Sequence, residues 1–220
     1  MKKTVLLLLL LMSLTAGCEM LHNGVAGSGN RQTEKRNIGN FTSISTDGAF
    51  EIEVVSQTPA SLEIQADDNI LPLITTEVSN NVLHIKNQRS YSVRTPVVIK
   101  ISTPTLEGIA ANGAGTFTVS GVKTEKFGIN VNGAPKIYVS GETKALKIDA
   151  NGAASIDTHK LRADSAVVGS NGVSKVEVYV VNDLNVTVAG PSRVTYHGDP
   201  QVKQDISGPG SVTKKESTGS

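Results

Sequence analysis

The feature that most restricts the fold of this 220-residue chain is a repeat in its second half. From Ile109 to Lys215 the sequence recurs around a glycine, most often in the dipeptide Asn-Gly. The aligned glycines are Gly113, Gly133, Gly152, Gly172, Gly190 and Gly208, which are spaced by 20, 19, 20, 18 and 18 residues. A steady period of this length is typical of a solenoid, in which each repeat forms one coil stacked on the last.

Apolar residues lie at even distances from each glycine. Around Gly133 they are Ile129, Val131, Ile137 and Val139, and the residues between such positions are mostly polar. Because side chains alternate along a strand, each repeat predicts two short strands, with the glycine at the corner between them and the even positions facing inward. One coil cannot bury its own inner face, but stacked coils bury it as ladders with a spacing of about 4.8 Å.

We therefore predict an all-β fold, a right-handed parallel β-helix of about six coils over residues 109–213, each with 18–20 residues. Residues 37–108 are expected to form a less regular β region of the same domain. The residues around Gly48 repeat the pattern of apolar residues at even distances from a corner glycine. Ser79-Asn80-Asn81 lies between two alternating runs like the turn of a hairpin. This region, a small sheet or irregular coils, would cap the open end of the solenoid.

The first 17 residues have the features of a signal peptide. Lys2 and Lys3 precede an apolar run from Val5 to Leu14, which is too short to span a bilayer as a helix. Small residues then lead to Cys18, the single cysteine, as in a bacterial lipoprotein signal, although Thr15 stands where leucine is usual. We expect lipid on Cys18 to anchor the mature chain to the membrane; the alternative is an ordinary secretory signal with an incidental cysteine.

Two polar segments are expected to be flexible: residues 18–36, as a tether after the anchor, and residues 214–220, as a disordered tail. Without residues 1–17 the chain has 19 basic and 20 acidic residues, because two of its 21 basic residues lie in that segment. A nearly neutral chain gives no reason to expect binding to nucleic acid.

Three stretches resemble one known bacterial family. They are the segment Phe41 to Val54, the pair Asn80 to Ile85 and Val97 to Ile101, and the Asn-Gly-Ala series at 112–114, 132–134 and 151–153. Together they look like the family described as putative auto-transporter adhesin, head GIN domain, over roughly residues 37–212. The resemblance implies a β-helical domain outside the cytoplasm, often in envelope lipoproteins. It brings no catalytic or binding residues with it.

The asparagines Asn112, Asn132, Asn151 and Asn171 all precede the corner glycine. We interpret them as structural turn residues, because asparagine tolerates left-handed backbone and glycine supplies positive φ. The alternative is a row of amides that binds a sugar chain. The last two repeats have Ala189 and Ser207 at this position, which favours the structural interpretation.

A surface patch of Asp157, Lys175, Glu177 and Arg193 is the other candidate, on outward positions of neighbouring coils. Two carboxylates about 5 Å apart are typical of a retaining glycosidase, but alternating charges on an outward face are usually a screened network. His159 and His197 share one register two coils apart, about 10 Å by the strand spacing, which is too far to share a metal ion. We expect no catalytic residues, metal or cofactor.

The sequence thus predicts a non-enzymatic, lipid-anchored protein of the cell envelope, facing the periplasm or the exterior, whose β-helix is a rigid scaffold for interaction. Its partners would be a protein or glycan ligand, or a second copy packed side by side through the flat ladder faces to give a homo-oligomer. The alternative is a β-helix that binds or cleaves carbohydrate with the patch of Asp157, Lys175, Glu177 and Arg193.

Overall fold

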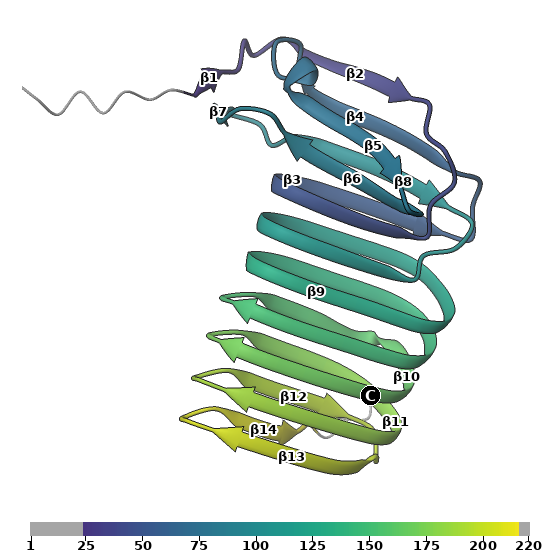
Figure 1. Cartoon of the computed structure of the whole chain (residues 1–220), viewed down its shortest axis with the longest axis vertical. Coiled ribbons are helices and arrows are strands. Elements are labelled where there is room, and N and C mark those ends of the chain that lie inside the picture. The colour runs from purple at the N-terminus through teal and green to yellow at the C-terminus, as the bar shows by residue number, and fades with distance from the viewer. Residues whose placement is uncertain (1–23, 216–220) are drawn as a thin grey trace, which may run out of the picture.

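The computed structural model describes residues 24–215, and most of this part is β-structure (Figure 1). Its strands are β1 (Val25–Ala26), β2 (Arg31–Arg36), β3 (Ser43–Ser56), β4 (Ser61–Asp67), β5 (Ile74–Ser79), β6 (Val82–Asn87), β7 (Tyr91–Ser92), β8 (Val98–Thr103), β9 (Gly108–Gly152), β10 (Ser155–Gly172), β11 (Lys175–Ala189), β12 (Arg193–His197), β13 (Gln201–Ser207) and β14 (Ser211–Lys214). A short 3-10 turn, η2 (Leu71–Leu73), precedes β5. The prediction of an all-β chain is confirmed.

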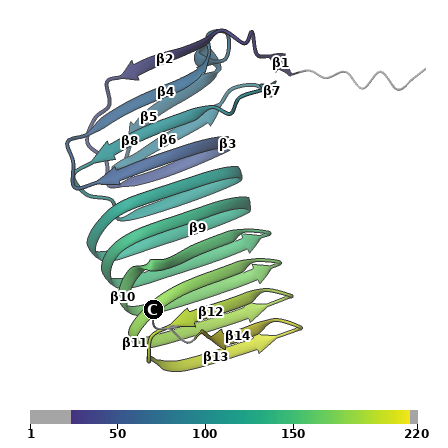
Figure 2. The same ribbon diagram turned by 180° about the vertical axis from the view of Figure 1, so that it is seen from behind.

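Segments one repeat apart in the sequence lie side by side and parallel. β10 pairs with β9 from Ser155↔Lys136 to Gly172↔Gly152, with a register shift between Asp157 and Lys160. β11 continues the stack on β10, and β12 and β13 continue it on β11. The long β9 bends around its own corners, so that the chain runs as a series of stacked turns (Figures 1 and 2).

The segment around Gly48, which repeats the pattern of the later turns, belongs to the same stack. β3 pairs in parallel with β9 over thirteen positions, from Ser43↔Gly108 to Val55↔Ser120. Gly48 therefore lies directly beside Gly113, although 65 residues separate them in the sequence. The residues between these two neighbouring strands form the region above β3 in Figure 1.

That region is a mixed sheet. β8 pairs in parallel with β3, but β4 is antiparallel to β8, and β2 is antiparallel to β4. β5 and β6 form the predicted hairpin, which turns at Asn80 (φ 50°) and Asn81 (φ 61°), and β6 lies parallel to β3. Residues 24–215 thus form one large mixed sheet of twelve strands with a separate pair, β1 and β7, and the parallel stacking of repeats expected from the sequence holds in its later part.

The prediction of a flexible tether over residues 18–36 is wrong for its last part. β1 pairs with β7, and β2 forms the outermost strand of the sheet, so residues 31–36 belong to the folded domain. β2 has the sequence Arg-Gln-Thr-Glu-Lys-Arg and no apolar pattern. It can still form a strand, because a strand at the edge of a sheet is held by main-chain pairing. Arg36 also donates hydrogen bonds to the carbonyl oxygens of Ile74 (2.6 Å) and Leu71 (3.1 Å). Residues 18–23 lie outside the described part.

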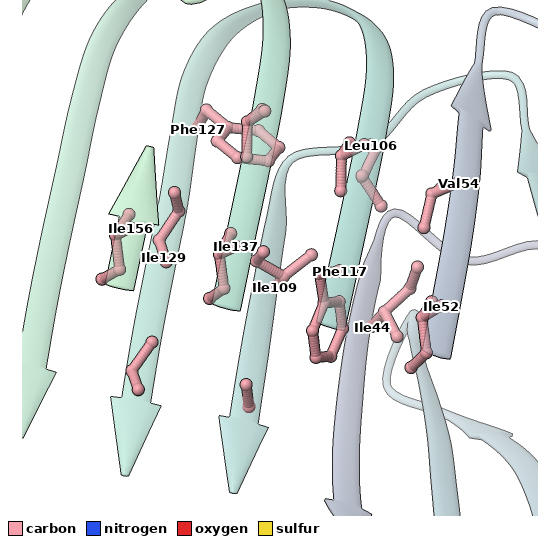
Figure 3. Close-up of a cluster of buried hydrophobic side chains, with 14 of the residues drawn as sticks. Ile44, Ile52, Val54, Leu106, Ile109, Phe117, Phe127, Ile129, Ile137 and Ile156 are labelled. Carbon is pink, nitrogen blue, oxygen red and sulfur yellow. The ribbon is translucent and has the colours of Figure 1, made fainter. Parts of the chain in front are cut away.

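The even positions of the repeats form the core. Ile109, Phe117, Ile129 and Ile137 are at most 3% exposed. Figure 3 shows these side chains gathered between successive strands, together with Ile44, Ile52 and Val54 from β3. Each fully buried aliphatic side chain contributes about 1.5–3 kcal/mol relative to an exposed one. The apolar ladders inferred from the sequence are therefore the main source of stability in the stack.

The corner glycines form a column with no room for a side chain. Gly133 has φ +147°, and a Cβ placed on it would lie 2.1 Å from the carbonyl oxygen of Gly113. A Cβ on Gly152 would likewise lie 2.2 Å from the carbonyl oxygen of Gly133. The close stacking of coils at this corner thus depends on glycine for both its backbone angle and its lack of a Cβ.

We predict that Gly133→Ala lowers the free energy of unfolding by about 3 kcal/mol or more, because positive φ and a backbone clash act together. Gly39→Ala is the matched control, since a Cβ there would have no atom within 4 Å. It should change stability by at most about 0.5 kcal/mol. Urea unfolding followed by circular dichroism measures both variants, and equal effects would contradict a steric role for the column.

Candidate functional site: polar rows on the outer face

Two polar rows run across the outside of the stack. The first is the row of asparagines at the glycine corner. The side-chain amide of Asn132 donates to the Oδ1 of Asn112 (3.1 Å), that of Asn151 to Asn132 (3.5 Å), and that of Asn171 to Asn151 (3.2 Å). The amides thus bond to one another along the stack. Each amide offers two donors and an acceptor with two lone pairs, so the exposed row also keeps hydrogen-bonding capacity toward solvent.

The second row contains the charged residues that the sequence singled out. Asp157 on β10 and Glu177 on β11 are register partners, so their carboxylates lie on adjacent strands of one outward face. Lys175 and Arg193 are also register partners and both are exposed. The two carboxylates do not pair with them: Asp157 contacts His159, and Glu177 contacts His197 and Lys215. The proposed four-residue patch is therefore two pairs of neighbours and not one ion-pair network.

Each carboxylate of this row is bonded to a histidine. The Nδ1 of His159 is in close hydrogen-bonding contact with Oδ1 of Asp157, which also accepts from the backbone N–H of His159 (3.1 Å). The Nε2 of His197 lies 2.7 Å from Oε1 of Glu177. The two imidazole rings themselves are neighbours, with centroids 5.9 Å apart. We call these four residues, together with Lys215, the histidine–carboxylate cluster.

Lys215 closes the cluster from the end of the described chain. Its Nζ lies 3.0 Å from Oε1 of Glu177, and its backbone N–H donates to the carbonyl oxygen of Tyr196. The prediction of a disordered tail from residue 214 is therefore wrong at its start, because Lys214 ends β14 and Lys215 is held by both contacts. Residues 216–220 lie outside the described part.

The electrostatics of Glu177 follow from these contacts. The pKa of Glu177 is lowered to about 2, chiefly by the hydrogen bond from His197, against the opposing effect of burial; hydrogen bonding and charge from Lys215 contribute to the same lowering. A general acid in a glycosidase needs a raised pKa, so that it holds a proton near neutral pH. The pKa of Glu177 is lowered instead, so its carboxylate is ionised near neutral pH and suited to accept hydrogen bonds.

The distance between the histidines differs from the sequence-based estimate. Two coils at regular spacing would place them about 10 Å apart, whereas the ring centroids are 5.9 Å apart. The cause is local: the pairing of β10 with β11 shifts register between Thr158 and Arg162, so that His159 leaves the regular ladder. Within residues 24–215 no group of three or more His, Cys, Asp or Glu side chains is arranged to hold a metal ion.

A shallow groove lies at the other corner of the turns, where β9 and β10 bend into the next repeat. Its volume is about 690 Å³, and it is lined by four acidic and four basic side chains together with threonines. Lys123 pairs with Glu142 (3.0 Å) and Lys144 with Glu125 (2.8 Å) across adjacent turns. The charges of this groove therefore largely neutralise one another.

The sequence identified Asp157, Glu177 and the shared register of His159 and His197, but it missed that they form one cluster. The missing information was the register shift in β10 and the ordered position of Lys215. Neither has a clear marker in the sequence, because a bulge in a strand depends on how the neighbouring turns pack.

This combination of stacked strands, a glycine corner and outward polar rows defines a repetitive all-β domain. Residues 40–200 match the family model described as "Putative auto-transporter adhesin, head GIN domain". The match spans most of the chain, and the protein belongs to this family. The expected resemblance is thereby confirmed.

Solved structures share the fold. A putative adhesin from Bacteroides fragilis NCTC 9343 is 24% identical with a TM-score of 0.67, over 88% of this chain and 100% of that one. A putative adhesin from Parabacteroides merdae ATCC 43184 is 17% identical with a TM-score of 0.55, over 88% and 99% of the two chains. A protein from Parabacteroides distasonis ATCC 8503, described as a putative lipid binding protein, is 20% identical with a TM-score of 0.51, over 87% and 99%.

Among proteins with curated descriptions, none matches this chain. Across residues 24–215, no helix has the length and apolar character needed to cross a membrane.

We predict that the ionised carboxylate of Glu177 stabilises the fold near neutral pH and that this contribution is lost in acid. Its pKa is about 2 in the folded chain against a usual value of 4.5, so its contribution is present above about pH 4.5 and is lost as the pH falls toward 2. Glu177→Gln should lower the free energy of unfolding by about 1–2 kcal/mol at pH 6, since screening around exposed Lys215 reduces the full effect.

The measurement is urea unfolding at pH 6 and at pH 3, with Glu53→Gln as the control because Glu53 is an exposed carboxylate of β3. The difference between wild type and Glu177→Gln should shrink at the lower pH, whereas Glu53→Gln should match wild type at both. A pH-independent loss in Glu177→Gln would contradict the electrostatic explanation.

Proposed function

We propose that the protein is a non-enzymatic, lipid-anchored protein of the cell envelope, and that its stacked turns form a right-handed parallel β-helix that acts as a rigid scaffold for adhesin-like interaction. The observation that carries this proposal is the continuous stack from β3 to β14, with a buried aliphatic interior and polar rows on its outer face. A right-handed path is the expected one, since parallel crossovers are right-handed in about 98% of cases.

Rigidity is what such a stack provides for binding. The glycine column and the asparagine row hold successive turns in one register, so that equivalent outward side chains repeat along a straight face. A preorganised surface of this kind binds an extended partner with little loss of conformational entropy. The family description, an adhesin head domain, supports the same function.

An attachment point at Cys18 completes this proposal. The short apolar run and the lone cysteine support a lipid anchor, which would place the stack outside the cytoplasm with its β2 end nearest the membrane. Cys18 itself lies outside the described residues, so the support for its role comes from the sequence pattern.

The second candidate is a carbohydrate-binding or carbohydrate-cleaving β-helix. Binding is favoured by the asparagine row and by the in-register carboxylates Asp157 and Glu177, since sugars are recognised by arrays of amides and carboxylates. Cleavage is less well supported, because Glu177 has a lowered pKa and is bonded to His197.

We predict that Cys18→Ala releases the chain from the membrane fraction into the soluble fraction when it is expressed with its N-terminal segment. Loss of two buried acyl chains removes most of the free energy of membrane attachment, at about 0.8 kcal/mol per CH₂. Immunoblots of fractionated cells give the readout, with Cys18→Ser as a second non-lipidated variant. Unchanged membrane association and mobility would contradict anchoring at Cys18.

We also predict that binding to an envelope or host glycan, if it uses the outer rows, is weakened by changes there. Glycan-array binding of wild type is compared with Asp157→Asn, Asn132→Ala and, as a control on β4 and outside both rows, Glu63→Gln. A loss of about tenfold in affinity confined to Asp157→Asn or Asn132→Ala would favour the carbohydrate alternative. Absence of any glycan or lipid-vesicle binding, together with capture of a protein from intact envelopes, would favour the scaffold.

A further inference from the structure

The two ends of the stack differ in how their outermost strands are paired. The first end is closed by the antiparallel strands β4 and β2, and its outer strand carries three basic residues and one acidic residue. At the other end, β13 pairs only with β11, and β14 only with β12, among residues 24–215. The outer edge of β13 therefore presents unpaired main-chain donors and acceptors, a surface that another strand can complete.

β13 differs from the strand above it in burial. All seven of its residues, Gln201–Ser207, are exposed. Val202 and Ile206 stand in the same inward columns as Leu184 and Val188, which are fully buried, yet Val202 is 38% and Ile206 37% exposed. The interior of the stack is thus open at this end, and a further strand beneath β13 would cover both side chains.

The sequence of β13 is chemically symmetric about its central residue, Gln204. Val202 and Ile206 are equidistant from it, as are Lys203 and Asp205, and the ends are polar Gln201 and Ser207. In an antiparallel pair, residues at equal distances from the centre face one another. Two copies of β13 would therefore place Lys203 opposite Asp205 twice, and Val202 opposite Ile206 twice, with Gln204 facing its own copy.

We propose that this edge binds a second copy of the same chain, through antiparallel β13–β13 pairing about a two-fold axis at Gln204. The contact is self-complementary in hydrogen bonding, charge and apolar burial, as a two-fold interface requires. It joins two stacks end to end and makes their interiors continuous. The packing differs from the side-by-side association through flat ladder faces that the sequence led us to expect.

The opposite edge does not fit a second copy. In β2, antiparallel self-pairing about the centre of Arg31–Arg36 would bring Arg31 opposite Arg36 of the other chain, which is repulsive. Arg36 is also committed to Glu34 (2.9 Å) and to main-chain oxygens of the turn beside β5. Of the two end strands β2 and β13, β13 is therefore the one that combines open main chain with charge complementarity.

The position of this contact has a consequence that rests on the proposed lipid anchor. The N-terminal strands and β13 lie at opposite ends of the stack (Figure 1). An end-to-end dimer then carries its two anchors at its two far ends, so that it would link two facing membranes. The proposed adhesin-like function would in that case be homophilic, with the chain as its own partner.

The first test is cysteine cross-linking in the full-length chain. Gln204→Cys should form an intermolecular disulfide under mild oxidation, because directly opposed residues of antiparallel strands lie about 4.5–5.5 Å apart between Cα atoms. Lys203→Cys is the matched control, since two copies of residue 203 would be offset by two positions and out of disulfide range. The wild type, whose single cysteine is Cys18, reports any background cross-linking.

The second test uses charge reversal. Lys203→Asp alone places Asp opposite Asp205, and Asp205→Lys alone places Lys opposite Lys203, so each should weaken self-association about tenfold or more. An equimolar mixture of the two variants restores both opposite-charge pairs and should dimerise like wild type. Sedimentation velocity of the full-length chain measures the association, and recovery in the mixture shows that both variants are folded.

Equal cross-linking at residues 203 and 204, no cross-linking at either, or no recovery in the mixture would each overturn the interface. A head-to-tail assembly through β13 and β2 would appear as open-ended oligomers without a Gln204→Cys disulfide, and would also overturn it. Membrane bridging is tested separately with cells that display the chain. Failure of those cells to aggregate, with the soluble dimer intact, would refute the bridging consequence and leave the interface standing.

Discussion

In-register parallel pairing of turns one repeat apart is the constraint on which the rest of this structure depends. It stacks side chains of like kind above one another, so that aliphatic positions merge into one buried core and polar positions into outward rows. It also requires close approach of the backbone at one corner, and there only glycine fits, as the contact between Gly133 and Gly113 illustrates. Core, corner and outer face are thus consequences of one pairing rule.

The same rule organises the candidate sites. The asparagine row exists because Asn112, Asn132, Asn151 and Asn171 occupy one position of successive turns, and Asp157 and Glu177 are neighbours for the same reason. Function on such a scaffold is expected from repeated, weak and well-positioned contacts, and not from a single concave site. The open edge of β13 is the place where the pairing rule is left incomplete within the described chain, and it is the natural place for a second copy to continue it.

Where sequence-based prediction failed, the cause was interaction between distant segments. The strand at Arg31–Arg36 has no apolar period, and it is defined only by its antiparallel partner β4. The approach of His159 to His197 depends on a register shift that follows from packing between β10 and β11. Lys215 belongs to the cluster because the carboxylate of Glu177 is within its reach, which nothing in a polar tail predicts.

The sequence by itself determined the all-β class, the period of the stack, the inward residues of each turn, the corner glycines and the family, because all of these are encoded by local alternation and by repetition. Only the tertiary structure decided that Gly48 lies beside Gly113, that an antiparallel cap closes the first end, and that histidines and carboxylates meet on the outer face. These features arise from contacts between residues far apart in the chain, whose geometry is set when the turns stack and not by the pattern of any one segment.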